Sequence, residues 1–422
     1  MRTILRQRPL RLIFTANLVS MLGSGMNSAA VTWFILQATH SETALGVLMV
    51  VATIPALLTL PCTGVIIDRE DRRRLVMLLD ASRGIIILAV AIMAFRGRVQ
   101  LWHLYFMNTL VAAGFWMFWP TITALIQELT PESQFVQSNT FLLAGVQGGW
   151  LMAGALVGFV YNRIGLGGVL LIDFSTYLVS FLCYLGVRKG RHVVKPVTSE
   201  LAAEIRAAET AFARFWRELR EGMSFLRGNS YVVLVGVSWA LFIGAMLAQG
   251  VVTAPMSDRI LHAGAVGYGW LNAGWGVGAF VSTLYAAAMI RALGARRAVA
   301  FSMALLSLCL FALPYSPVLA IAVGVYGIMG SARGVGGVSI SSSLMEIVPK
   351  HFMGRVQNTF YFAGTMLQLL LSFGVGAVAH RVGLAAAFAI IALVYFVAAV
   401  TAAWPAQPMR AVAASAESTS GS

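Results

Sequence analysis

Long apolar stretches alternate with short polar connections along almost the whole chain. Twelve of these stretches are each about 18 to 29 residues long. An α-helix of about 20 apolar residues crosses a bilayer core that is roughly 30 Å thick. The pattern therefore predicts an all-α membrane protein whose twelve spanning helices cover residues 12–37, 43–67, 75–95, 101–126, 136–160, 167–187, 231–254, 264–290, 298–315, 317–345, 355–379 and 383–404.

The composition agrees with a multi-pass membrane protein. Of the 422 residues, 59% are hydrophobic and 11% are charged, and the mean hydropathy is +0.81. Soluble domains usually carry about 25% charged residues. The net charge of +14 lies mainly in the connections, so we expect no nucleic-acid partner. Cys62, Cys183 and Cys309 are far apart in apolar stretches, which predicts neither a disulfide framework nor a metal site, and we expect no cofactor.

The basic residues indicate the orientation of the chain. If the N-terminus is cytoplasmic, 23 of the 30 Lys and Arg residues fall in cytoplasmic segments and five in external ones. The other two, Arg83 and Arg333, lie within predicted helices. Cytoplasmic loops of membrane proteins carry an excess of Lys and Arg. Both termini are therefore predicted to be cytoplasmic.

One long connection, residues 188–230, divides the chain into an N-terminal block (1–187) and a C-terminal block (231–404) of six predicted helices each. Within this linker, apolar residues between 201 and 223 recur at helical spacing. This spacing predicts an amphipathic helix that lies on the inner membrane surface or between the blocks. The last residues, 405–422, have the composition of a disordered tail.

The two blocks share a short motif at corresponding positions, between the fourth and fifth helix of each. Asn139, Thr140 and Phe141 recur 219 residues later as Asn358, Thr359 and Phe360. Internal repeats of this kind are typical of transporters that are built from two bundles.

Seven consecutive charged residues, Asp68 to Arg74, separate the second and third predicted helices. The spacing around them resembles the major facilitator loop signature G-x-x-x-D-R-x-x-R-R, which is matched by Gly64, Asp68, Arg69, Arg72 and Arg73. Together with Asp80 and Arg83 further on, the form DRxDRR is similar to the exporter branch that includes enterobactin and macrolide efflux proteins.

The resemblance runs from about residue 10 to residue 404. It implies two pseudo-symmetric six-helix bundles in the bacterial cytoplasmic (inner) membrane. It also implies a conformational latch that holds the bundles together in the outward-facing state, formed by Gly64, Asp68, Arg69, Arg72, Arg73, Asp80 and Arg83. The arginines satisfy the positive-inside pattern as well, so topology alone is an alternative interpretation of them.

Two ionisable residues within predicted helices are candidate sites, because charges are costly inside a bilayer. Arg333 lies in a stretch rich in Gly and Ser. It either lines a cavity, where it would favour an anionic or carbonyl-rich substrate, or has a structural role. Asp173 is a candidate for coupling transport to the proton gradient. A structural hydrogen bond is the preferred alternative for this residue.

The resemblance also implies that the first, fourth, seventh and tenth helices line a central cavity. Polar and aromatic residues in the first three of these are candidate substrate contacts: Asn17, Asn27, Asn108, Trp116, Trp119 and Trp239. Aromatic rings suit an amphipathic substrate through stacking and apolar contact. Tryptophans also gather at membrane interfaces, so contact with lipid is an open alternative.

These observations favour a secondary active transporter that exports a small amphipathic compound by alternating access with proton coupling. The compound would be a drug, a macrolide or a siderophore-like molecule, the other partners would be protons and membrane lipids, and we expect a monomer. A lysophospholipid or other lipid transporter, and a non-transporting receptor or scaffold, are the alternatives. The sequence contains no P-loop and no compact catalytic set, which argues against an ATP-driven pump and an enzyme.

Overall fold

The computed structural model describes residues 7–130, 135–187, 230–348 and 350–405, together with residues 213, 216–217, 219–224 and 226. These residues are helical almost throughout, which confirms the all-α prediction. Most of the predicted linker helix, and the predicted tail after residue 405, lie outside the described residues. Eleven of the described helices are long and apolar enough to cross a membrane.

Five long helices belong to residues 8–187, which we call the first half. They are α2 (Arg8–Thr39), α3 (Glu42–Arg69), α4 (Arg72–Phe95), α5 (Leu101–Leu129) and α6 (Phe135–Leu185). The last of these bends at Gly165, whose φ of 63° is accessible to glycine at little cost. Its two arms coincide with the predicted helices 136–160 and 167–187, so eleven helices account for all twelve predicted spans.

The second half, residues 230–405, contains six long helices. They are α8 (Ser230–Pro255), α9 (Gly264–Leu293), α10 (Ala295–Ala312), α11 (Leu319–Ile347), α12 (Lys350–Arg381) and α13 (Leu384–Ala403). One turn of π-helix, η2 (Met256–Ile260), follows α8, and a 3₁₀ turn, η3 (Leu313–Tyr315), follows α10. The predicted span boundaries agree with these helices to within about five residues.

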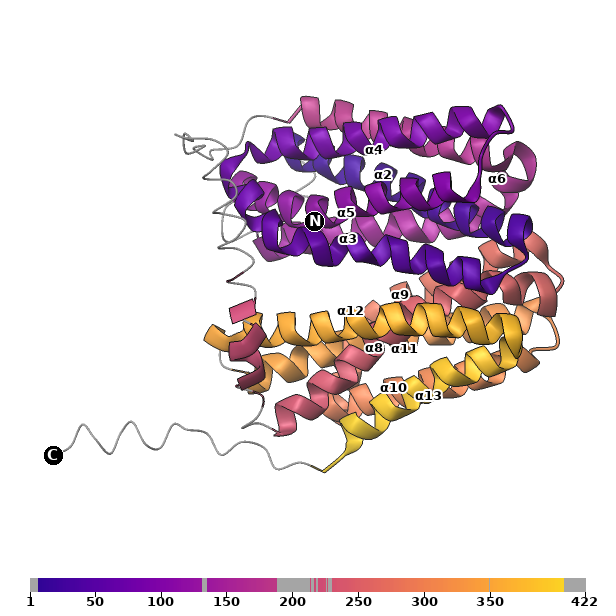
Figure 1. Ribbon diagram of the computed structural model, residues 1–422. Helices are drawn as coiled ribbons and strands as arrows, with labels where there is room; N and C mark the ends of the chain where they lie inside the picture. Colours follow the sequence, from indigo (N-terminus) through magenta and orange to yellow (C-terminus); the bar gives the residue numbers. More distant parts are fainter. Residues whose placement is uncertain are drawn as a thin grey trace.

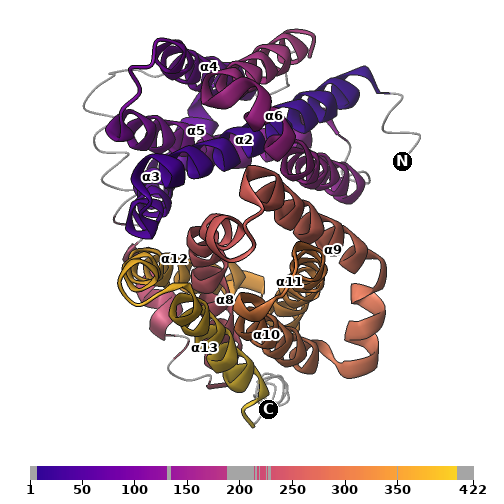
Figure 2. The same ribbon diagram turned by 90° about the vertical axis from the view of Figure 1, so that its right-hand side faces the viewer.

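The helices of the first half lie on one side of the molecule and those of the second half on the other (Figures 1 and 2). In the first half, α2 packs against α6, and α5 packs against α3 and α4. In the second half, α8 packs against α12 and α13, and α11 packs against α9 and α10. One cluster of buried apolar side chains, which includes Met21 and Phe118, lies within the first half, and a larger cluster continues into the second.

The most extensive contacts between the halves are those of α3 with α12 and of α6 with α9, and α8 also contacts α3. Glycines allow the backbones to approach closely there, because they have no side chain. A Cβ at Gly158 would lie 2.4 Å from the carbonyl oxygen of Ala265, and a Cβ at Gly376 would lie 2.7 Å from that of Glu42. The two halves therefore meet in direct backbone contact along both pairs.

Among the described residues, the ionic contacts between the halves lie where α3 begins, which we call the Glu42 end. Glu42 forms an ion pair with Arg259, and His380 Nδ1 lies 3.4 Å from its carboxylate. Arg259 also donates a 2.7 Å hydrogen bond to the carbonyl oxygen of His40. The opposite end of the molecule, where residues 69–74 join α3 to α4, we call the loop end.

Candidate functional site

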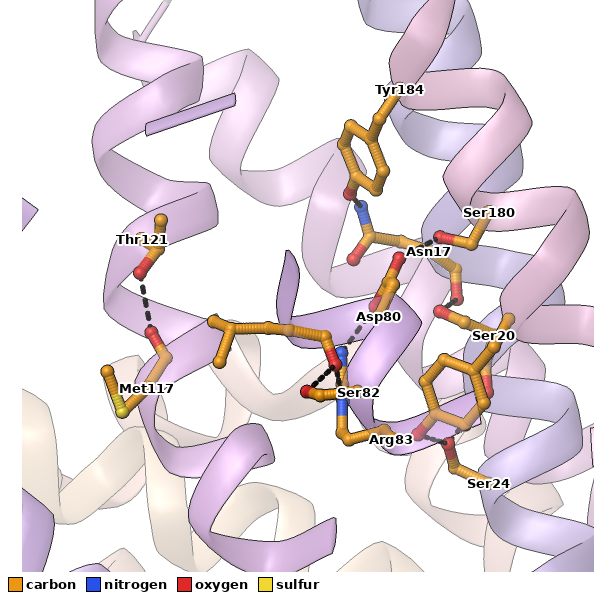
Figure 3. Close-up of polar contacts among 12 residues, drawn as sticks. Asn17, Ser20, Ser24, Asp80, Ser82, Arg83, Met117, Thr121, Ser180 and Tyr184 are labelled. Carbon is orange, nitrogen blue, oxygen red and sulfur yellow. Dashed lines mark hydrogen bonds and ion pairs between the residues drawn. The ribbon is translucent and has the colours of Figure 1, made fainter. Parts of the chain in front are cut away.

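An ion pair between Asp80 and Arg83 lies in the middle of α4 (Figure 3). Arg83 Nη2 donates to Asp80 Oδ1 at 2.5 Å, and the other carboxylate oxygen accepts a 2.6 Å bond from the Ser180 hydroxyl of α6. The two side chains are 1% and 0% exposed. A buried charge is tolerated when it is paired and hydrogen-bonded, so these contacts join α4 to α6.

Aromatic rings enclose the guanidinium group of Arg83. Its central carbon lies 4.7 Å from the ring centroids of both Phe118 in α5 and Tyr177 in α6. Such contacts are attractive because the face of the ring is negative. Gly114 of α5 leaves room for the side chain, since a Cβ there would lie 2.8 Å from Arg83 Cδ. Arg83 is therefore part of the packed interior of the first half.

Asp173 of α6 belongs to the same polar region and is fully buried. Asn27 Nδ2 of α2 donates to its carboxylate at 2.7 Å, and the Thr176 hydroxyl donates to its backbone carbonyl at 2.7 Å. The contact between α2 and α6 is close here, because a Cβ at Gly23 would lie 2.5 Å from Asp173 Oδ1. The structural hydrogen bond expected for Asp173 is thus present, and its role in coupling stays a prediction.

Two further contacts extend this polar region along α2 (Figure 3). Asn17 Nδ2 donates to the Tyr184 hydroxyl at 3.1 Å, and the hydroxyl groups of Ser24 and Tyr177 lie 2.9 Å apart. The residues from α2, α4 and α6 together form what we call the polar cluster: Asn17, Ser24, Asn27, Asp80, Arg83, Asp173, Tyr177, Ser180 and Tyr184. Sequence reasoning missed its serine and tyrosine members. The available signal was the polar spacing at 173, 177, 180 and 184, which follows one face of a helix.

The arginines at the start of α4 bond to partners in the first half. Arg72 forms a 2.6 Å ion pair with Glu128 of α5, and Arg73 Nε donates to the carbonyl oxygen of Tyr184 at 2.8 Å. Their described contacts thus stay within one half, as do those of Asp80 and Arg83. The other members of the predicted latch fall outside the described side chains: Gly64, Asp68 and Arg69. The latch therefore stays a prediction.

Among the predicted cavity residues, Trp116 has a ring contact that crosses between the halves. Its ring centroid lies 6.2 Å from that of Tyr361 in α12, edge to face. Asn108 donates to a carbonyl oxygen of its own helix. Trp119 packs against the apolar cluster of the first half, and Trp239 packs against the larger one.

Arg333 lies in the middle of α11, fourteen residues from Leu319 and fourteen from Ile347. Its guanidinium carbon lies 4.5 Å from the centroid of the Trp275 ring in α9. Within the described part of the chain, Arg333 has no carboxylate partner and no hydrogen bond from its side chain.

Comparison with known families decides what kind of protein this is. The family model described as Major Facilitator Superfamily matches residues 13–257, more than half of the 422 residues. The chain belongs to the major facilitator superfamily. The prediction from the loop signature is therefore confirmed, and the protein is a multi-pass membrane transporter of this superfamily, whose members carry small molecules.

Relatives within the superfamily point in the same direction. The chain is 22% identical over 369 residues to the MFS-type transporter YkuC of Bacillus subtilis (strain 168), which covers 84% of this chain and 81% of the relative. It is also 21% identical over 220 residues to macrolide efflux protein A of Streptococcus pyogenes, covering 51% of each chain. The predicted similarity to macrolide exporters is thus confirmed.

Solved structures of the superfamily share the fold. A bacterial homologue of the iron transporter ferroportin, in an inward-facing state, matches with a TM-score of 0.70 and 16% identity over 94% of this chain and 99% of that one. A POT family transporter matches with a TM-score of 0.71 and 13% identity, covering 93% and 95%. At this identity the likeness concerns the fold alone.

Proposed function

We propose that this transporter exports a small amphipathic compound, such as a drug, a macrolide or a siderophore-like molecule, by alternating access coupled to protons. One observation carries the proposal. The described ion pairs between the halves lie at the Glu42 end, whereas Arg72 and Arg73 at the loop end bond within the first half. A carrier of this kind holds one end together while the other admits the substrate.

The distribution of Lys and Arg supports a cytoplasmic loop end and an external Glu42 end. In this proposal both termini are cytoplasmic, and the protein is a monomer in the bacterial inner membrane. Residues 1–187 and 231–404 act as two pseudo-symmetric bundles, and residues 188–230 link them. The arrangement described above then corresponds to the inward-facing state, in which an exporter receives its substrate from the cytoplasm. The name of the Streptococcus pyogenes relative supports the direction of transport.

In this proposal, residues of the loop signature form the latch that stabilises the outward-facing state. Asp68, with Gly64 and Arg69, ends α3 at the loop end, where it would contact the second half once that end closes. We expect Asp68→Asn to lower the export rate while the amount of protein in the membrane stays near that of the wild type. An unchanged rate would rule out the latch.

Asp173 is the proposed site of proton coupling. Its described hydrogen bonds come from an amide and a hydroxyl group, and its carboxylate is buried between α2 and α6. Asp173→Asn keeps the shape of the side chain but cannot release a proton. We expect this variant to exchange substrate across the membrane without any response to an uncoupler.

The export proposal is tested with cells that express the protein and cells that lack it. Accumulation of a panel of amphipathic compounds is measured with and without a protonophore. We expect expressing cells to retain less of at least one compound, and the protonophore to abolish the difference. Glu42→Gln should weaken closure of the Glu42 end and reduce export several-fold, whereas Glu70→Gln at an exposed position should not. Equal accumulation in both cell types for every compound would refute export.

A further inference from the structure

We propose that Arg333 and Trp275 form a binding site for the oxyanion of the transported compound, a carboxylate or phosphate group attached to an apolar body. The inference rests on the proposed transport function and specifies the chemistry of its substrate. Four properties of the site support it: the position of Arg333 along α11, the direction of its side chain, its unpaired charge and the space beside it.

The depth of Arg333 is that of a substrate site. It lies at the midpoint of α11, about 21 Å from either end at 1.5 Å per residue. Alternating-access carriers bind their substrates near the middle of the membrane. An arginine at this depth cannot extend its charge to either membrane surface. Its cost in a bilayer, roughly 2.5 to 3.5 kcal/mol by insertion scales, therefore needs a functional reason.

The side chain of Arg333 points away from lipid. Exposed apolar residues of α11 include Ile328 and Val338, at 48% and 50% exposed. Each is five residues from Arg333, which is roughly 140° around a helix of 3.6 residues per turn. Tyr326 is seven residues away, roughly 20° from Arg333, and it is buried with its hydroxyl bonded to Thr253 of α8 at 2.9 Å. Arg333 thus lies on the interior face of α11, which α8 and α9 approach.

The positive charge of Arg333 has no carboxylate partner among the described residues of its half, and its electrostatic neighbour there is the buried phenol of Tyr395 in α13. Residues 230–405 contain two acidic residues, Asp258 and Glu346. Asp258 lies in η2 at the Glu42 end, and Glu346 is thirteen residues along α11, about 20 Å away. Within the described residues, Arg333 has no ion pair. A charge of this kind in the middle of a spanning helix is a functional candidate whose natural partner is an anion.

The neighbours of Arg333 orient its guanidinium group and leave space for an oxyanion beside it. Gly330 brings α9 close, since a Cβ there would lie 2.0 Å from the Trp275 carbonyl oxygen. The Trp275 ring then lies against the guanidinium face, which leaves the edge with its N–H donors free for bidentate bonds to a carboxylate or phosphate. Gly337, one turn further on the same face, has no atom within 4 Å of a built Cβ.

The first test measures binding by isothermal titration calorimetry to the purified full-length protein in nanodiscs. Three probes share one apolar body and differ in charge: 2-naphthoate, 2-naphthamide and 2-naphthylmethylamine. A fourth probe, oleoyl lysophosphatidate, is compared with neutral monoolein. We expect the wild type to bind the anion of at least one matched set about tenfold more tightly than its neutral analogue. Preference for naphthoate identifies a free acid, and preference confined to lysophosphatidate identifies a lipid headgroup.

Variants test whether the preference for the anionic probe depends on Arg333 and the space beside it. Arg333→Gln should abolish the preference for the anion, Arg333→Lys should retain part of it, and Arg381→Gln, at an exposed position, should leave it intact. Gly337→Leu should block binding with Arg333 in place. Gly324→Leu is its control, because Gly324 also has open space but lies on the opposite face of α11. Melting temperatures establish that each variant is folded.

Two outcomes would overturn the inference. One is equal affinity of the wild type for the anion and the neutral analogue in both sets. The other is an anion preference that survives in Arg333→Gln. Either result leaves the export proposal standing if the cells still extrude a compound in response to the proton gradient. If no compound is exported while Arg333-dependent anion binding is found, the export proposal fails and the binding site stands.

Discussion

Arg83 and Arg333 each lie near the middle of a long helix, but their surroundings are opposite. Arg83 lies eleven residues after the start of α4 and Arg333 fourteen after the start of α11. Arg83 has Asp80 as a partner at 2.5 Å and rings on two sides. Arg333 has one ring, that of Trp275, and no carboxylate partner among the described residues.

The difference corresponds to the two roles that we propose for arginine in this protein, a structural one for Arg83 and a ligand-binding one for Arg333. A buried charge whose partner belongs to the same protein strengthens the connection between helices, and its removal leaves the partner uncompensated. A buried charge without such a partner adds little to folding and keeps its bonding capacity for a ligand. Stability measurements and transport measurements should therefore rank the two sites in opposite order.

The largest effect on stability is expected for Asp80→Asn. The variant removes the carboxylate that is hydrogen-bonded to Arg83 and leaves Asp173 as an electrostatic neighbour without a direct bond. Breaking a buried pair typically costs about 3 to 5 kcal/mol. We expect a strongly lowered melting temperature and a reduced yield of monodisperse protein in size-exclusion chromatography. Glu70→Gln, which changes an exposed carboxylate, is the control. A melting temperature equal to that of the wild type would contradict a structural role for the pair.

The second effect is expected for Gly114→Val. The new Cβ would lie 2.8 Å from Arg83 Cδ, so Arg83 must move away from Phe118 and Tyr177. Overpacking of an interior usually costs about 1 to 3 kcal/mol. Thermal unfolding in detergent measures the loss. Gly324→Val, where a built Cβ meets no atom within 4 Å, should unfold near the wild-type temperature, and equal losses in both variants would argue against the clash.

A smaller loss is expected for Ser180→Ala. The substitution removes the 2.6 Å bond to Asp80, which costs about 1 to 2 kcal/mol when the acceptor stays buried. The matched control is Ser175→Ala, because Ser175 is exposed and bonds to its own helix. The free energies of unfolding of the two variants, measured by thermal unfolding, should therefore differ by most of this amount. Identical curves would mean that Asp80 does not depend on Ser180.

The smallest change in stability is expected for Arg333→Met. No described acceptor loses a bond, and the substitution removes the cost of a charge in the bilayer. Loss of the cation–π contact with Trp275 opposes this gain. The free energy of unfolding should therefore change by less than about 1 kcal/mol, in either direction, while export of anionic compounds is lost. Arg83→Met, measured beside it, should lose about 3 kcal/mol or more because Asp80 is left unpaired. Equal destabilisation of the two variants would remove the distinction between the sites.

The sequence predicted the spans well because each one is encoded locally by apolar length. The loop signature predicted the family, since Gly64 and the residues of the charged run have fixed spacing. The polar cluster was harder to predict, because Ser180 meets Asp80 across 100 residues. The sequence does not reveal which face of α4 packs against α6. It therefore assigns Asp80 and Arg83 to the predicted latch, whose other residues are close to them in sequence, and not to the polar cluster. Arg333 was noticed from its position within an apolar helix, but Trp275, 58 residues earlier, could be assigned to it only from the fold.

The ionic contact at Glu42 has a consequence for turnover. Its acid is fully buried, whereas Arg259 and His380 are 38% and 51% exposed and therefore already partly hydrated. Glu42 also lies in the first turn of α3, where backbone N–H groups favour a negative charge even without a cation nearby. Separation of the halves thus leaves none of the three groups strongly destabilised. In the proposed alternating-access cycle, this contact can therefore be broken and remade at each turnover.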